Sequence, residues 1–317
     1  MRRARAVTLT PRQLFFLIMP PLMWAGNAVV GRMLVGHLPP VFMNALRWAL
    51  VAVLLAPLAR GVWRQWPQVR ARWPHLAFVG ALGVGSYNAL QYLALQTSTP
   101  LNVTLIASSM PVWMMVVGAV GHGQRITRRQ AFGAALSSAG VMLVLARGSW
   151  QALQQVHWVP GDLLMLLAAL AWSVYSWQLA SPPAHMQGAQ RPAWNWAEFL
   201  WLQVVFGLAF AVVCSGAEQA VLASRPVPFA WPQGWAAWQP LALGMAFIAI
   251  GPSILAYWGW GKGVAAAGPT VAALFSNLTP VFAAGWAWLL LGQVPQWYHP
   301  VALLLIASGI MVSSRQR

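Results

Sequence analysis

Long apolar runs alternate with short polar or charged breaks along the whole chain. Each run is close to the length of about 20 residues that a helix needs to cross the hydrocarbon core of a bilayer. Backbone polar groups in lipid must be hydrogen-bonded within the protein, so each run is expected to be a helix. The pattern predicts ten spans, over residues 14–34, 40–58, 75–96, 102–121, 128–146, 162–180, 196–215, 240–261, 270–291 and 298–314.

Two of these runs carry the same polar interruption. IASSMPVW (106–113) and FSNLTPVF (275–282) each place small polar residues before a proline, and Pro111 and Pro280 are 169 residues apart. At that offset residues 101–142 align with 270–311 without gaps. The identical pairs are Leu105/Leu274, Pro111/Pro280, Val112/Val281, Gly123/Gly292, Gln124/Gln293, Leu136/Leu305, Gly140/Gly309 and Met142/Met311.

The repeat predicts two halves, residues 1–150 and 151–317, with five spans each. Trp24 and Trp172 extend the correspondence to the first span of each half. Because five is an odd number, the second copy crosses the membrane in the opposite direction to the first. Inverted repeats of this kind are the architecture of many secondary transporters, whose substrate site lies near the midplane between the copies.

Composition supports this interpretation. The chain of 317 residues is 59% hydrophobic and only 7% charged, whereas a soluble domain carries about 25% charged residues. The single cysteine excludes a disulfide framework and a cysteine-ligated metal site. The first apolar run is too long for the core of a signal peptide, so we expect an uncleaved first span.

The net charge of +16 would suggest a nucleic-acid partner in a soluble protein, but here the charges lie in alternate loops, and the expected partner is the lipid bilayer. With the N-terminus in the cytoplasm, only Arg32, Arg147 and Arg225 fall towards the opposite side. The basic residues on the cytoplasmic side are Arg2, Arg3, Arg5, Arg12, Arg60, Arg64, Arg70, Arg72, Arg125, Arg128, Arg129, Arg191, Lys262, Arg315 and Arg317. The positive-inside rule therefore places both termini in the cytoplasm, in a bacterial inner membrane.

Two connections are rich in tryptophan. The segment 61–75 mixes Trp with Arg, which is typical of the headgroup level of a membrane. The segment 228–240 spaces Trp231, Trp235 and Trp238 on one helical face, which predicts a short helix on the outer surface. We expect both to anchor the protein at the membrane, and a role in gating is the alternative.

Several motifs resemble those of a known family. They are WAGNAVVGR (24–32), PPVFMNALRW (39–48), YNALQYLAL (87–95), the S-x-x-P-V element at 109–112, GDLLMLLAALAWSVYS (161–176) and SNLTPVFAAGWAWLLLGQ (276–293). Together with the five-plus-five plan they resemble the EamA-type transporters of the drug/metabolite transporter superfamily. The resemblance implies export of small metabolites, commonly amino acids. Gln124 and Gln293 depart from it, since family members often carry Glu after the glycine.

The candidate substrate-binding residues are polar and aromatic side chains that share helical faces inside the predicted spans. They are Trp24 and Asn27, Tyr87, Asn88 and Gln91, Ser108 and Ser109, Trp172 and Tyr175, Ser253 and Tyr257, and Asn277. Aromatic stripes also occur where helices simply pack, and small serines allow close helix contact. Ser and Asn beside a proline can bond the backbone groups that it frees or line a polar cavity. Both interpretations stay open from the sequence.

Arg47 is the strong charge that lies well inside a predicted span. A charge at that depth is costly and suggests a function. The sequence leaves two roles open for it, pairing with helix-end carbonyls or contact with a substrate carboxylate.

The predicted spans lack acidic residues and histidines near the midplane, and this limits the functions that the chain can have. All six histidines lie in loops or at span ends, Asp162 and Glu198 begin spans, and Glu218 is expected outside the spans. No midplane acid is expected, which disfavours a carboxylate proton relay and a cationic substrate. No catalytic residue, cofactor or metal site is predicted, because the pairs that intramembrane proteolysis requires and phosphate-binding glycine loops are missing.

The function predicted from the sequence is secondary export of small neutral or zwitterionic metabolites by alternating access. Amino acids, including aromatic or apolar ones, are the expected class. A channel, a structural membrane subunit or an exporter of another metabolite class is the alternative. The oligomeric state is open, and a monomer is compatible with the sequence.

Overall fold

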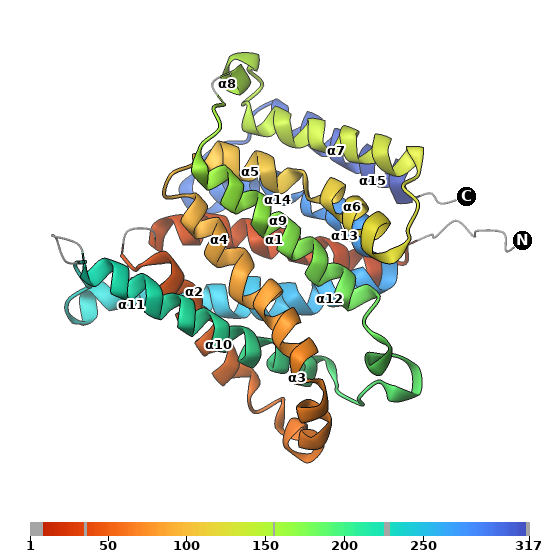
Figure 1. The fold of residues 1–317 in the computed structure, drawn as a ribbon. Coiled ribbons are helices and arrows are strands. Elements are labelled where there is room, and N and C mark those ends of the chain that lie inside the picture. The colour runs from red at the N-terminus through yellow and green to blue at the C-terminus, as the bar shows by residue number, and fades with distance from the viewer. Residues whose placement is uncertain (1–8, 35–36, 155, 225–228, 315–317) are drawn as a thin grey trace, which may run out of the picture.

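The structure is a computed structural model that describes residues 9–34, 37–154, 156–224 and 229–314. Within these ranges the regular elements are helices, and no β-strand occurs (Figure 1). In chain order they are α1 (Pro11–Leu34), α2 (Pro40–Leu55), η1 (Arg60–Gln65), α3 (Trp66–Gly80), η2 (Ala81–Ser86), α4 (Tyr87–Ala94), α5 (Pro100–Ser108), α6 (Met110–His122), α7 (Arg128–Leu145), α8 (Trp150–Gln154), α9 (Pro160–Ala180), η3 (Ala184–Met186), η4 (Gly188–Gln190), α10 (Trp196–Ala223), α11 (Gly234–Ile248), η5 (Ala249–Leu255), α12 (Ala256–Ala267), α13 (Pro269–Ser276), α14 (Thr279–Leu291) and α15 (Tyr298–Ser314).

Helices occupy each range that the apolar runs predict. By length and hydropathy, five helical segments of the described chain qualify as membrane spans, namely 11–31, 160–180, 196–223, 234–267 and 269–290. Two bent helix pairs raise this number to seven if each pair counts as one span. The chain is therefore a helical multi-pass membrane protein, and the count of ten spans stays a prediction.

The outer surface is apolar. Val120 is 85% exposed, Val213 is 73% exposed and Leu289 is 71% exposed, and each belongs to a different helix. Extensive exposed apolar surface would make a soluble monomer aggregate. On a helical bundle surrounded by lipid tails, the same apolar side chains face an apolar environment.

The two segments that carry the sequence repeat form matching helices. α6 and α14 hold 13 residues each, with boundaries that differ by the offset of the repeat. Each ends before a glycine with positive φ, Gly123 at 63° and Gly292 at 66°, a conformation that glycine adopts without steric cost. The amide of the next residue, Gln124 or Gln293, then bonds to the carbonyl six residues earlier in both copies.

The prolines of the repeated interruption start new helices. α5 ends at Ser108 and α6 begins at Met110, with a bend of 43° between them. Pro111 therefore lies in the first turn of α6, where a missing N–H costs no helical hydrogen bond. Pro280 has the same place in the first turn of α14. Each predicted span is thus built from two helices joined at a polar break.

Helices of the two predicted halves contact each other in a reciprocal pattern. α1 packs against α12 and α14, while α9 packs against α4 and α6. α2 packs against α10, and α7 lies alongside α15 (Figure 1). Replacing every helix by its counterpart in the other predicted half exchanges the contacts of α1 with those of α9, and it leaves the pairs α2–α10 and α7–α15 unchanged.

The contact between α7 and α15 is made by small residues. A Cβ atom added to Gly133 would lie 2.6 Å from the carbonyl oxygen of Gly309, and one added to Gly140 would lie 2.8 Å from that of Ala302. Residue numbers rise along α7 as they fall along α15, so the two helices run antiparallel. The absence of side chains at these positions lets the backbones approach closely.

Two expectations for the connections are wrong. The sequence predicts a separate surface helix over 228–240, but α11 begins at Gly234 and continues through η5 into α12. The apolar pattern continues without a polar break, so one long helical segment forms; residues 225–228 lie outside the described ranges. Glu218 is not outside a helix, because α10 extends to Ala223.

In this position Glu218 completes the start of another helix. Its carboxylate oxygens accept hydrogen bonds from the amides of Val41, at 2.9 Å, and Phe42, at 2.8 Å. These amides belong to the first turn of α2, whose N–H groups have no partner within the helix. The carboxylate therefore joins α10 to the positive end of α2.

Candidate functional site

Two π-helical segments interrupt helices in the middle of the bundle. η2 joins α3 to α4, and η5 joins α11 to α12, so the segments occupy corresponding places in the two predicted halves. π-Helical turns frequently occur at functional sites, because they leave backbone groups without their usual helical partners. The side chains that bond these groups are therefore candidate site residues.

The carbonyls of η2 are bonded from other helices. The Tyr257 hydroxyl donates to the Gly83 carbonyl at 2.6 Å, and the Asn44 amide donates to the Val84 and Gly85 carbonyls at 3.4 Å. Both donors are buried. The bond from Tyr257 connects α12 to η2, so it spans the two predicted halves.

η5 is bonded in a similar way. The Trp24 indole donates to the Pro252 carbonyl at 3.2 Å. Ser253 donates from its hydroxyl to the Ile248 carbonyl at 2.8 Å, and it accepts a hydrogen bond from Arg47 Nε at 2.5 Å. α2 thus contributes Asn44 to one π-helical segment and Arg47 to the other.

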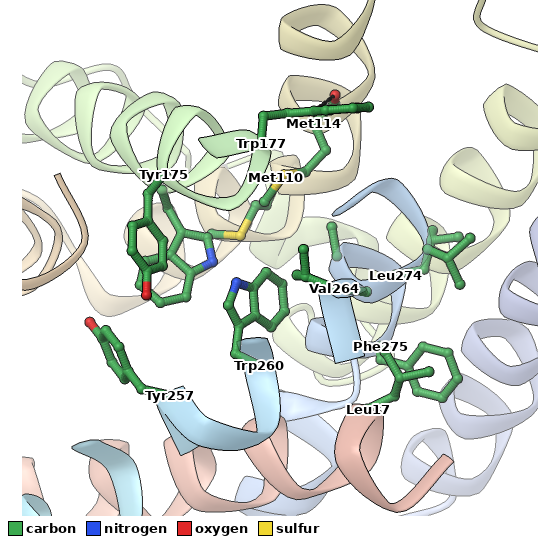
Figure 2. Close-up of a cluster of buried hydrophobic side chains, with 14 of the residues drawn as sticks. Leu17, Met110, Met114, Tyr175, Trp177, Tyr257, Trp260, Val264, Leu274 and Phe275 are labelled. Atoms are coloured by element: carbon green, nitrogen blue, oxygen red, sulfur yellow. Dashed lines mark hydrogen bonds between the residues drawn. The ribbon is translucent and has the colours of Figure 1, made fainter. Parts of the chain in front are cut away.

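An aromatic cluster lies beside these segments. We define it as Trp24, Trp48, Tyr87, Trp172, Tyr175, Tyr257 and Trp260. The Trp172 ring is at its centre, with ring centroids 5.0–5.4 Å from those of five other members, Trp24, Tyr87, Tyr175, Tyr257 and Trp260. Trp48 joins through Tyr257, at 4.9 Å. Figure 2 shows the Tyr175 and Tyr257 hydroxyl groups pointing towards each other from opposite helices.

Polar groups are interleaved with the rings. The Trp260 indole donates to the Ser176 hydroxyl at 3.0 Å, and Ser176 donates to the Trp172 carbonyl at 2.8 Å. The Asn88 side chain interacts with Tyr257. Aromatic faces with a few placed polar groups are typical of small-molecule sites. Such a site binds apolar or aromatic groups by stacking and orients them by hydrogen bonds.

The structure brings seven of the twelve predicted site residues together. Trp24, Tyr87, Asn88, Trp172, Tyr175 and Tyr257 form or contact the aromatic cluster. Ser253 is linked to it through Arg47, whose guanidinium lies over the Trp48 ring. Two other predicted residues lie on the same helices, α1 and α4, but do not take part in these contacts. Asn27 is half-buried on α1, where its Oδ1 atom is enclosed without a hydrogen-bond partner, and Gln91 is half-buried on α4.

The remaining three predicted residues form hydrogen bonds at the helix breaks. Ser108 donates to the Leu105 carbonyl at 2.7 Å, and Ser109 donates to the Ile106 carbonyl at 2.6 Å. Asn277 donates to the Ser137 hydroxyl of α7 at 2.9 Å. These bonds satisfy backbone and side-chain groups at the breaks, which is one of the two roles that the sequence left open.

Four further residues belong to the site and are not among the predicted ones. They are Asn44, Trp48, Ser176 and Trp260. Asn44, Arg47 and Trp48 are three and four positions apart on α2, so they share one face. That spacing in the second predicted span could have identified these residues from the sequence. The Arg47 guanidinium also lies over the Trp48 ring, with its carbon 5.0 Å from the ring centroid.

Two pockets lie near helix ends. One of about 110 Å³ is lined by the turn after α6 and by the turn from α12 to α13, including Gln124 and Thr270. Another, of about 450 Å³, lies between the ends of α7 and α14 and includes Gln293 and His299. At the breaks themselves, Met110, Met114, Phe275 and Leu278 belong to the main apolar core.

Metal-binding chemistry is not apparent in the part of the chain that the structure describes. There, no three His, Cys, Asp or Glu side chains lie close enough to hold a metal ion. The three carboxylates of the chain are all at helix ends. Asp162 accepts bonds from Ser98, Asn102 and the Val159 amide, and Glu198 accepts a bond from the Asn195 amide.

The chain is similar to known transporters over nearly its full length. The profile described as the EamA-like transporter family matches residues 12–146 and 159–315. An uncharacterized transporter of Archaeoglobus fulgidus is 25% identical, with 95% of this chain and 96% of that protein covered. The aromatic amino acid exporter YddG of Ancylobacter novellus is 26% identical, with 87% and 86% covered. A solved structure titled "Crystal structure of protein" has a TM-score of 0.72 at 22% identity and covers 95% of this chain and 96% of its own.

Proposed function

We propose a specific transport activity for this chain, which belongs to the EamA-like transporter family and is a multi-pass membrane transporter of small molecules. The proposed activity is secondary export of neutral or zwitterionic metabolites, with amino acids that carry an apolar or aromatic side chain as the substrate class. The site is the aromatic cluster together with the polar groups of η2 and η5. We place the protein in a bacterial inner membrane with both termini in the cytoplasm.

The observation that carries the proposal is the enclosure of mixed aromatic and polar groups at the centre of the bundle. Trp172, Tyr175 and Tyr257 are each at most 3% exposed, and their rings meet between α9 and α12. The carboxylates of the chain are engaged at helix ends, so none is offered to a cationic substrate. An apolar or aromatic side chain would gain stacking contacts in such a site.

Alternating access is supported by the reciprocal packing of the helices. α7 and α15 correspond in the sequence repeat and run antiparallel, as two inverted copies of one helix would. The arrangement of α1 and α9 against their neighbours has the same reciprocity. We therefore propose inverted halves over residues 1–150 and 151–317, with five spans each, that rock about the central site.

The amino-acid substrate class is supported by a relative. The protein of Ancylobacter novellus is named as an aromatic amino acid exporter, and it aligns with most of this chain. The concentration of tryptophan and tyrosine in the aromatic cluster fits the same chemistry. Together these observations favour an amino-acid exporter over exporters of other metabolite classes.

Counterflow in proteoliposomes tests the proposal. Vesicles loaded with unlabelled L-tryptophan, L-phenylalanine or L-leucine should accumulate the labelled amino acid transiently, without an imposed proton gradient. A channel would equilibrate the label without this overshoot. The variant Trp172→Ala should lower counterflow, whereas Trp288→Ala should not, because Trp288 is 54% exposed on α14. Flux for cations alone, or flux only with a pH gradient, would contradict the proposal.

A further inference from the structure

Arg47 is a buried cation that lacks a full set of hydrogen-bond partners. Its side chain is 1% exposed, and it is the one buried Lys or Arg side chain among those that the structure describes. Its Nε atom is bonded to Ser253, but its Nη1 atom is enclosed without an acceptor. An enclosed charge with an unused N–H group is costly in a protein interior.

No acidic side chain in the described ranges balances this charge. The chain has three acidic residues, and each is engaged with groups other than Arg47. Asp162 bonds the start of α9, Glu198 bonds the start of α10, and Glu218 bonds the start of α2. Buried charges in proteins are normally paired, but no acidic side chain among the described residues pairs with Arg47.

The position of Arg47 connects this unpaired charge to the aromatic cluster. Its guanidinium carbon lies 5.0 Å from the centre of the Trp48 ring, and Trp48 contacts Tyr257. The bond to Ser253 fixes the guanidinium against η5, which is one of the two interruptions that frame the site. The remainder of a ligand whose acceptor group is bound at Nη1 would therefore lie within reach of the aromatic rings.

We propose that Arg47 binds the carboxylate of the transported substrate and makes the site selective for carboxylate-bearing molecules. This inference rests on the proposed function and adds to it the group that the protein recognises. Guanidinium–carboxylate pairs are short, charge-assisted and directional, so they orient the ligand as well as attract it. The apolar part of the substrate then lies against the aromatic cluster. Amines and amides that lack the carboxylate leave Nη1 unsatisfied.

Competition between matched ligands tests this selectivity. Unlabelled L-phenylalanine should inhibit counterflow of labelled L-phenylalanine at a concentration about tenfold or more below that needed for L-phenylalaninamide, since hydrogen bonds to charged groups have this magnitude. Arg47→Gln should remove the difference. Ser253→Ala should reduce it, because the guanidinium loses the bond that orients it. Arg64→Gln, which removes an exposed surface charge, should leave the difference unchanged.

A second measurement does not depend on transport. Ligand-induced thermal stabilisation of the purified protein should be larger for L-phenylalanine and 3-phenylpropionate than for their amides, and Arg47→Gln should abolish this preference. If Arg47→Gln fails to fold, the wild-type preference for the acid and its reduction in Ser253→Ala still test the role of Arg47. Equal effects of acid and amide on the wild-type protein would overturn the role of Arg47, even if amino acids are transported. A carboxylate preference without counterflow would support Arg47 and refute the proposed transport.

Discussion

The hydroxyl group of Tyr257 donates a hydrogen bond of 2.6 Å to the carbonyl oxygen of Gly83, across the boundary between the two predicted halves. The acceptor belongs to η2, and the donor lies in the first turn of α12, two residues after the end of η5. One side chain thus connects both interruptions. The bond couples the shape of one π-helical segment to the position of the other.

Removing this hydroxyl should weaken both stability and transport. We expect Tyr257→Phe to lower the free energy of unfolding by about 1 kcal/mol, the usual net contribution of a hydrogen bond. Because the ring remains, the aromatic contacts are kept, and Tyr257→Ala should have a larger effect. Thermal melting in detergent and counterflow in proteoliposomes measure the two effects. Tyr298→Phe, at the end of the bundle, is the matched control. Unchanged stability and flux in Tyr257→Phe would contradict the coupling.

The glycines between α7 and α15 give a second prediction. Gly133→Ala and Gly309→Ala should each lower the melting temperature, because a Cβ atom at either position would lie within 2.6 Å of the opposite backbone oxygen. Larger substitutions, such as leucine, should prevent folding. Gly285→Ala in α14 is the control, since a Cβ there meets no heavy atom within 4 Å. If all three alanine variants melt alike, the close contact is not present.

Asn277 and Ser137 should be energetically coupled. Their hydrogen bond of 2.9 Å connects the break after α13 to α7. A double-mutant cycle with Asn277→Ala and Ser137→Ala should give a coupling free energy of about 1 kcal/mol in unfolding experiments. Additive effects on stability, together with a loss of transport only in Asn277→Ala, would instead assign Asn277 to substrate contact.

The sequence predicted helix positions well, because the runs are long and their breaks contain glycine, proline or charged residues. Trp172 and Tyr175 could be found because their spacing follows the helical repeat. The partnership of Arg47 with Ser253 could not, since the two residues are 206 positions apart and their contact depends on how α2 packs. The π-helical segments were equally out of reach, because α2 and α12 bond their freed carbonyls only in the folded bundle.

The predicted topology can be tested with single cysteines. In a Cys214→Ser background, Arg125→Cys should react with a membrane-impermeant maleimide only from the cytoplasmic side. Gln296→Cys should react only from the opposite side, because the two exposed residues lie in turns that follow corresponding helices. Labelling of both from one side of the membrane would contradict the inverted arrangement.

The contact between α7 and α15 has a consequence for how such a chain can arise. Gly133 touches Gly309, and Gly140 touches Ala302, so a patch on one helix meets the corresponding patch on the other. A surface that is complementary to itself is the interface of a two-fold symmetric homodimer. A chain of half this length could therefore form the contact with a second, oppositely oriented copy of itself. Once both copies belong to one polypeptide, each copy can change alone. Such a divergence is present at this contact, because the position that corresponds to Gly133 in the second copy is Ala302.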